Sequence, residues 1–233
     1  MKTIDVCLSP ELMQLYDVRA RTVVVADVLR ATSCMVTAFA HGVQSITPYS
    51  DLNECKAAKA KGIITSGERD GQKVDGFDKG NSPFEYMDAD IRGKKIAFTT
   101  TNGTEAIHKA KGAEKLVVGS FLNLSAVAND LSSGESSVLI VCAGWKGRVS
   151  LEDTLFAGAL VEKLKNDFEL DCDAPLAALH LYNLARQDML GFLSNSAHVK
   201  RLARLNIRKD IAFCLEEDQY QVVPRLVSGV LVA

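Results

Sequence analysis

The chain has 233 residues, of which 47% are apolar and 24% are charged, and its 27 Lys and Arg against 29 Asp and Glu give a formal net charge of −2. These values are typical of a soluble globular protein and exclude disordered, fibrous and disulfide-scaffold classes. Near-neutrality also excludes the broad positive field that non-specific nucleic-acid binding requires.

The N-terminus and the cysteines bear on location. Asp5, Pro10 and Glu11 precede any long apolar run, so we expect no signal peptide, and no segment approaches the roughly 20 apolar residues that span a bilayer. The cysteines at 7, 34, 55, 142, 172 and 214 form no C-x-x-C pair, which argues against a structural zinc or dithiol site. We therefore expect these cysteines to be reduced thiols in a cytoplasmic protein. Because no apolar run is long enough, we also expect no membrane partner.

Strand and helix patterns alternate from residue 22 onward. Apolar, β-branched runs predict strands over 22–28, 43–49, 62–66, 94–100, 114–120 and 136–144, and the intervening segments predict helices over 31–42, 50–62, 103–112, 122–131 and 150–164. This alternation is typical of the α/β class and predicts a three-layer α/β/α sandwich around a mixed, mainly parallel sheet.

The last third of the chain has a different pattern. Residues 174–190 and 196–215 are expected to be helical, and the final residues resemble a β-ribbon, with Pro224 at a turn or edge. No linker, repeat or low-complexity tract interrupts the chain. We therefore expect a single domain over 1–233, with a helical appendage at 170–215 and a closing β-ribbon at 219–233.

A long loop is predicted between Ser66 and Ile91. It is rich in Gly, Asp, Asn and Pro and exceeds the usual length of a connection in a compact domain, which is typical of functional or disordered loops. Its apolar residues Phe77, Pro83, Phe84 and Tyr86 favour an ordered loop that packs on the rest of the molecule.

Polar residues follow the predicted strands at the ends where α/β sheets bind ligands. The candidates for binding an anionic substrate are Thr32, Ser33, Arg69, Asn81, Ser82, Thr101, Asn102, Gly103, Thr104, Ser120 and Asn123. Hydroxyls, amides and glycines at helix starts offer donors to an anion. The best such nest is the segment 99–104, of sequence TTTNGT. Five strand ends, those of 22–28, 62–66, 94–100, 114–120 and 136–144, are expected to converge on one site.

Carboxylates form the second group of candidates. The carboxylates suited to a hard divalent cation, most plausibly Mg²⁺, are Asp27, Glu68, Asp78 and Asp153, and the first three are the predicted ligands. The candidate catalytic residues are Asp27, Arg30, Glu152 and Asp153. The planar guanidinium groups of Arg30 and Arg69 can donate two hydrogen bonds each to phosphate or sulfonate. Each residue also has a structural interpretation, because Asp, Thr and Ser commonly cap helices and Asn-Gly commonly forms turns.

Several familiar motifs are absent or incomplete. The chain has no G-x-G-x-x-G, and Phe77-Asp78 follows Gly71 and Gly76 where a P-loop needs Lys and Ser or Thr. Haloacid-dehalogenase-type enzymes need a second Asp two residues after the first, and this chain has Leu29 after Asp27.

A cysteine-dependent phosphatase remains an alternative. Cys142 and Arg148 have the C-x5-R spacing of that class between a predicted strand and a predicted helix, although Val149 replaces the usual hydroxyl. In that mechanism a thiolate attacks phosphorus and the arginine binds the phosphoryl oxygens.

Five segments together resemble a known family. VVVADVLRATS, SGERDGQKVDGFDKGNSPFEY, TTTNGTEAI, GSFLNLSAVA and CAGWKGRVSLEDTLFAGAL are similar, in order, to the motifs of the 2-phosphosulfolactate phosphatases, the ComB family of coenzyme M biosynthesis. The C-terminal stretch from Ser196 to Pro224 is also similar, so the resemblance covers nearly the whole chain.

The resemblance implies a Mg²⁺-dependent phosphatase that hydrolyses (2R)-2-phospho-3-sulfolactate to 3-sulfolactate and phosphate, within a homodimer. Our working hypothesis for the mechanism is that Asp27, Glu68 and Asp78 hold Mg²⁺ and that Glu152 or Asp153 protonates the leaving alkoxide. Water and Asp27 both remain possible nucleophiles. A non-catalytic module that binds a small anionic metabolite is the other alternative, since it would need the anion nests without the carboxylates.

Overall fold

The computed structural model describes residues 2–170, 172–205 and 207–233, and the strands within these ranges form one mixed sheet. In chain order the strands are β1 (Thr3–Cys7), β2 (Arg21–Ala26), β3 (Ser45–Pro48), β4 (Ile64–Arg69), β5 (Gln72–Lys73), β6 (Lys95–Thr99), β7 (Lys115–Gly119), β8 (Ser137–Cys142), β9 (Glu169–Leu170), β10 (Arg225–Val227) and β11 (Val230–Val232). Their alternation with helices confirms the predicted α/β class.

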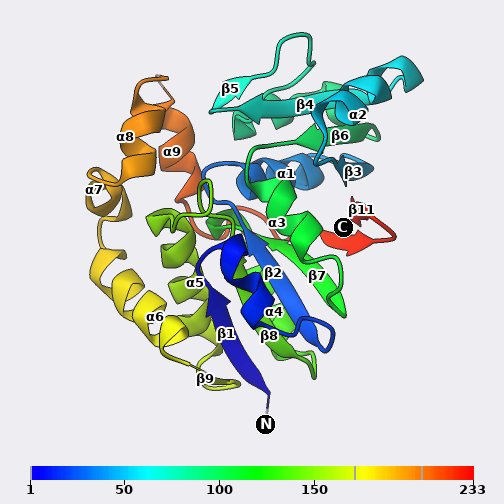
Figure 1. Ribbon diagram of the computed structural model, residues 1–233. Helices are drawn as coiled ribbons and strands as arrows, with labels where there is room; N and C mark the ends of the chain where they lie inside the picture. Colours follow the sequence, from blue (N-terminus) through cyan, green and yellow to red (C-terminus); the bar gives the residue numbers. More distant parts are fainter. Residues whose placement is uncertain (1, 171, 206) are drawn as a thin grey trace.

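The helices flank this sheet (Figure 1). The α-helices are α1 (Ala31–Ala40), α2 (Leu52–Ala57), α3 (Gly103–Lys109), α4 (Leu124–Ser132), α5 (Leu151–Leu164), α6 (Asp173–Ala185), α7 (Met189–Leu193), α8 (Ala197–Ala203) and α9 (Arg208–Cys214). Short 3₁₀ helices are η1 (Pro10–Leu15), η2 (Ala58–Lys61), η3 (Pro83–Tyr86), η4 (Ala89–Ile91) and η5 (Phe121–Asn123).

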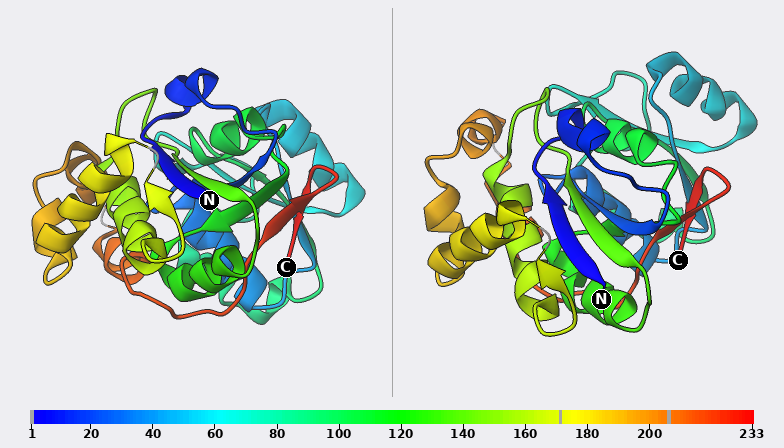
Figure 2. Two further views of the ribbon diagram at one scale, coloured as in Figure 1. Left: turned by 90° about the horizontal axis from the view of Figure 1, so that it is seen from below. Right: turned by 60° about the horizontal axis from the view of Figure 1, so that its bottom comes forward.

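The C-terminal ribbon lies within the sheet. The strand order is β5-β4-β6-β3-β11-β10-β7-β2-β8-β1-β9, so β10 and β11 separate the parallel group β4-β6-β3 from the parallel group β7-β2-β8-β1. Both ribbon strands are antiparallel to their outer neighbours, β7 and β3, and Figure 2 shows the ribbon from two further directions. A mixed, mainly parallel sheet is therefore confirmed, and the ribbon joins its two halves.

Alternating valines in β2 divide the apolar core into two layers. Val24 packs in a cluster with residues of α4, α5 and α6, whereas Val23 and Val25 pack in a cluster with residues of α1 and α3. All three valines are fully buried. A strand buried on both faces needs such a continuous apolar run, and the two clusters join the sheet to the two helix layers of the predicted sandwich.

Helix α6 packs closely on α5, and this packing leads the chain back toward the ends of the parallel strands. A β-carbon on Gly158 would lie 2.0 Å from the carbonyl oxygen of Ala178, so a larger residue would force the two helices apart. From α6 the chain continues to α8 and α9, which lie near the β4–β5 hairpin in Figure 1. Leu202 and Leu205 lie beside Gly71 in the turn of that hairpin.

Two details differ from the sequence-based predictions. The short strands β1, β5 and β9 were not predicted, and the ribbon begins at Arg225 and not at 219. The order expected for the 66–91 loop is confirmed, because Phe77, Pro83 and Tyr86 are buried there. None of the helices within the described ranges is long and apolar enough to cross a membrane. The single-domain assignment stays a prediction.

Candidate functional site

A polar hollow lies where β2, β4 and the β6–α3 loop meet α8. We call it the strand-end cavity; it is lined by Asp27, Leu29, Arg30, Glu68, Gly71, Asn81, Thr101, Asn102, Trp145, His198, Arg201 and Leu202. Six of the predicted site residues are in this set: Asp27, Arg30, Glu68, Asn81, Thr101 and Asn102. The location follows the general rule for ligands at the carboxyl ends of parallel strands.

Asp27 is held at the start of α1 by local hydrogen bonds. Its backbone N–H donates to Thr32 Oγ1 at 3.0 Å, and the Thr32 N–H donates to the Asp27 carbonyl at 2.9 Å. Gly103 lies directly behind the carboxylate, since a β-carbon there would be 2.7 Å from Asp27 Oδ2. Thr32 and Gly103 therefore orient and accommodate Asp27 and do not line the cavity themselves.

The environment of Asp27 disfavours its charged form. Burial raises the pKa of the carboxyl to about 7, with the Glu68 and Glu152 carboxylates adding to the rise and His198 opposing it. The side chain accepts one long bond, 3.4 Å, from the Ala31 N–H. A buried carboxylate with so few donors is suited to a cation or to reaction with a substrate.

Glu68 connects two loops beneath the cavity. One carboxylate oxygen accepts a hydrogen bond from the Gly71 N–H in the hairpin turn at 2.5 Å, and the other accepts from the Thr101 N–H at 2.8 Å. These bonds fix the side chain, while the remaining lone pairs of the oxygens can still reach a ligand.

The donor set fits a hard cation. Asp27 and Glu68 share the cavity with Asn81, whose buried Oδ1 atom has no hydrogen-bond partner among the described residues. Mg²⁺ takes one or two carboxylates and leaves its other positions to water and substrate oxygens. The described residues contain no cluster of three or more His, Cys, Asp or Glu with metal-binding geometry.

Asp78 is not brought to this cavity. Its Oδ1 atom pairs with Lys59 Nζ at 2.7 Å, and its Oδ2 atom accepts from the N–H and the hydroxyl of Thr65 at 2.9 and 2.8 Å. Thr65 lies three residues before Glu68 on β4, which separates them by about 10 Å along the strand. Asp78 thus braces the loop after β5 and is not brought together with Asp27 and Glu68, and its role as the third metal ligand stays a prediction.

Arg30 lines the cavity but is committed to the protein. Its Nη1 atom pairs with Asp210 of α9, and its Nη2 atom donates to the Gly71 carbonyl at 3.3 Å. The two ionised side chains are almost completely buried. In this arrangement the guanidinium links α1, α9 and the β4–β5 hairpin and is not a free fork, and the role of Arg30 toward the substrate stays a prediction.

Arg69 also points its guanidinium at protein groups. It donates to the Glu68 carbonyl at 2.7 Å and to Thr99 Oγ1 at 2.9 Å, and it is not among the lining residues. Ser33 is buried and donates to the Val28 carbonyl at 2.8 Å. Neither residue reaches the cavity as expected.

Glu152 and Asp153 have separate roles at the start of α5. Asp153 accepts from the backbone N–H groups of Val28 and Gly144, each at 2.9 Å; burial raises its pKa well above the usual range, helped by the carboxylates of Glu152 and Asp27. Glu152 pairs with Nδ1 of His198. Asp153 is a brace between two loops, whereas Glu152 acts on the cavity through the His198 ring.

The anion nest between 99 and 104 is only partly exposed to the cavity. Thr101 and Asn102 line it, and Thr101 Oγ1 is buried without a partner among the described residues. The Thr104 hydroxyl instead donates a hydrogen bond to the Thr100 carbonyl at 2.9 Å. Ser82 lines a neighbouring hollow that shares Asn81 with the strand-end cavity.

The end of β7 does not contribute to the site. Asn123 accepts from the Ser120 N–H at 2.9 Å and donates to the Val222 carbonyl at 2.9 Å, which makes the two residues a buried helix cap. The segment before β10 covers this turn, since the Tyr220 N–H donates to the Leu122 carbonyl at 2.8 Å. The expected convergence of all five strand ends is wrong at this strand.

The helical side of the cavity was not predicted from the sequence. His198, Arg201 and Leu202 project from α8, and Trp145 comes from the loop after β8. The guanidinium carbon of Arg201 lies 3.8 Å from the centre of the Trp145 ring. Positions 198, 201 and 202 follow the i, i+3, i+4 spacing of one helix face, which was the available signal.

Cys142 is unsuited to the thiolate alternative. It is fully buried at the end of β8, and burial raises the pKa of its thiol well above the usual range. Its C-x5-R segment closes as a tight turn in which the Trp145 N–H donates to the Arg148 carbonyl at 2.8 Å. Nucleophilic cysteines need exposure and a lowered pKa, so this arrangement argues against that mechanism.

Comparison with known proteins identifies the family. The sequence profile described as 2-phosphosulpholactate phosphatase matches residues 7–229. A protein of Thermotoga petrophila named probable 2-phosphosulfolactate phosphatase is 44% identical over 230 residues, covering 98% of this chain and 97% of the relative. Similarly named proteins of Caldanaerobacter subterraneus and Clostridium acetobutylicum are 41% and 36% identical, covering 92% and 97% of this chain and 91% and 98% of theirs. The chain belongs to the 2-phosphosulpholactate phosphatase family.

Proposed function

We propose that the protein is a Mg²⁺-dependent phosphoric monoester hydrolase that converts (2R)-2-phospho-3-sulfolactate and water to 3-sulfolactate and phosphate. Family membership and the names of the relatives support the reaction. The structural observation that carries the proposal is one cavity with the buried carboxylates of Asp27 and Glu68 on one side and the cationic side chain of Arg201 on the other.

The charges of the cavity suit this substrate. Phosphosulfolactate carries phosphate, sulfonate and carboxylate on three carbons, and hydrolysis of a phosphate monoester is among the slowest uncatalysed reactions. When bound, Mg²⁺ would neutralise phosphoryl charge and orient a water nucleophile. Asp27, Glu68 and the amide oxygen of Asn81 are the residues that would hold it, and Thr101 offers a buried hydroxyl to the phosphoryl oxygens.

His198 is the residue we propose for proton delivery. The leaving alkoxide needs a proton, and the His198 ring lines the cavity while its Nδ1 atom pairs with Glu152 Oε1. That pairing orients the ring and leaves Nε2 for the substrate, as in other carboxylate-histidine pairs. Glu152 is then a positioning residue, which modifies the sequence-based hypothesis that it protonates the alkoxide directly.

Phosphate release from phosphosulfolactate tests the proposal. Activity should be lost after dialysis against EDTA, return with added Mg²⁺, and persist in Cys142→Ser. Activity that survives EDTA but disappears in Cys142→Ser would support the thiolate mechanism. Binding without phosphate release from any ester would support a non-catalytic module. Cytoplasmic location, a homodimer and a place in coenzyme M biosynthesis remain predictions, which fractionation, sedimentation and metabolite analysis would test.

A further inference from the structure

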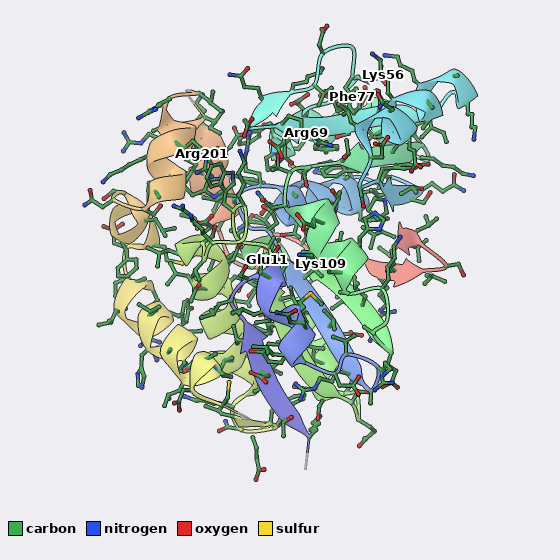
Figure 3. All side chains as sticks on the ribbon, in the orientation of Figure 1. Glu11, Lys56, Arg69, Phe77, Lys109 and Arg201 are labelled. Carbon is green, nitrogen blue, oxygen red and sulfur yellow. The ribbon has the colours of Figure 1, made fainter. Side chains whose placement is uncertain are left out.

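The guanidinium of Arg201 is fixed in place without a partner for one of its nitrogens. It stacks on the indole of Trp145, 3.8 Å from the ring centre, and Figure 3 shows the side chain on α8. No described residue accepts a hydrogen bond from its buried Nη2 atom. A buried, unpaired guanidinium nitrogen is costly, so the arrangement is suited to an incoming anion.

A comparison of the two arginines in the cavity shows which one is available. The guanidinium of Arg30 pairs with Asp210 and donates a hydrogen bond to the Gly71 carbonyl. Arg201 forms no ion pair with the described carboxylates, although Glu152, Asp70 and Glu68 lie close enough to act on it electrostatically. Burial lowers the pKa of Arg201, which indicates that its charge is poorly solvated. An anionic ligand would offset that desolvation.

From this geometry, and resting on the proposed function, we infer that Arg201 and Trp145 form the subsite for the sulfonate of the substrate. The guanidinium would donate to sulfonate oxygens through its unpartnered edge, and the indole would hold it flat for that contact. Arg201 is thereby a specificity-determining residue.

The layout of the cavity favours the sulfonate over the other two anionic groups. The phosphoryl group must lie beside Asp27 and Glu68, where the reaction occurs. The carboxylate is bonded directly to the carbon that carries the phosphate ester, whereas the sulfonate follows a methylene and reaches one bond further. Leu202 and Trp145 add apolar surface around Arg201, which suits a large, weakly hydrated anion.

Paired substrates test this subsite. Phosphosulfolactate and 2-phospholactate share the ester and the carboxylate, and only the first carries a sulfonate. We expect Arg201→Gln to lower kcat/KM on phosphosulfolactate about 10- to 100-fold more than on phospholactate, as loss of a charge-assisted hydrogen bond predicts. Arg204→Gln, at an exposed position just after α8, is the matched control and should leave the ratio unchanged. An equal loss on both substrates would contradict a sulfonate subsite.

A binding measurement separates this inference from the proposed reaction. In calorimetric titration, 3-sulfolactate should bind the unaltered protein at least about tenfold more tightly than lactate, and Arg201→Gln should abolish the difference. If the protein released no phosphate from phosphosulfolactate yet kept this preference, the proposed reaction would fail and the subsite would stand. If sulfolactate bound no better than lactate, the subsite would be disproved whether or not hydrolysis occurred.

Discussion

The strand-end cavity has two walls of different origin. The strand wall, formed by Asp27, Glu68 and Thr101, is built on β2, β4 and the β6–α3 loop, and backbone N–H groups hold both of its carboxylates. The helical wall is formed by His198 and Arg201, which rest on the side chains of Glu152 and Trp145. The difference separates two tasks: the rigid strand wall suits bond breaking, and the helical wall suits proton delivery and recognition of the substrate.

The first prediction tests this division of tasks by removing the Asp27 carboxylate from the strand wall. Asp27→Asn should lower kcat at least about 10³-fold, because a central charged group that acts on the transition state contributes about 4 kcal/mol or more. Phosphate release and thermal unfolding should be measured together. Since burial disfavours the charged form of Asp27, the melting temperature should stay the same or rise.

Asp75→Asn is the matched control for that substitution, because Asp75 is an exposed carboxylate of the loop after β5. It should leave both the rate of phosphate release and the melting temperature unchanged. Retention of more than a tenth of the activity in Asp27→Asn would show that the strand wall does not carry the chemistry.

The second prediction concerns the Arg30–Asp210 pair, which links the start of α1, next to Asp27 of the strand wall, to α9. Arg30→Met and Asp210→Leu should each lower the free energy of unfolding by about 3–5 kcal/mol, since each leaves a buried charge without its partner. The double variant should lose less than the sum of the two. Urea unfolding of the three variants gives the coupling energy, and strict additivity would show that the two side chains do not depend on each other.

The two walls also differ in how far the sequence predicts them. Asp27 and Glu68 follow apolar strands, and the sheet rule places them at one edge without further information. The same rule fails for Ser120 and Asn123, because the chain before β10 returns from the far end of the sequence and covers the end of β7. Nothing local to those residues signals that cover.

The helical wall depends on packing between segments that are remote in sequence. His198 reaches the cavity because α5 and α6 pack closely at Gly158 and so lead the chain back toward the strand ends. Helix spacing alone puts His198 and Arg201 on one face, but it does not say what that face covers. Similarly, Arg30 resembles a free anion-binding residue until its distant partner, Asp210, is known.

A third prediction sharpens the assignment of proton delivery to the helical wall. His198→Gln should lower kcat on phosphosulfolactate about 100-fold, within the usual range for general acid catalysis. With p-nitrophenyl phosphate, whose leaving group departs without a proton, the loss should be less than about threefold. Steady-state kinetics on the two esters provides the comparison. Equal losses on both would indicate that His198 binds the phosphoryl group or supports the fold.

Glu152→Gln is the companion variant, because Glu152 acts through the His198 ring. It should lower kcat on phosphosulfolactate in the same direction as His198→Gln but less severely, and it should add little when the two are combined. Independent, additive losses would contradict a shared role.

The smallest expected effect lies outside both walls, at Asp78. Burial raises the pKa of this carboxyl, but the Lys59 ammonium and the Thr65 donors outweigh it and hold the pKa at about 2, below the ordinary 3.8. Asp78→Asn should cost about 1 kcal/mol of stability at pH 7, a modest figure because the pair is partly solvated. A depressed pKa means that the unfolded chain takes up the proton first, so the cost should shrink as pH falls from about 4 to about 2. Urea unfolding across that range measures it. Activity at pH 7 should be unchanged even at limiting Mg²⁺, whereas a large loss at limiting Mg²⁺ that excess Mg²⁺ reverses would return Asp78 to the metal site and make the cavity a three-carboxylate centre.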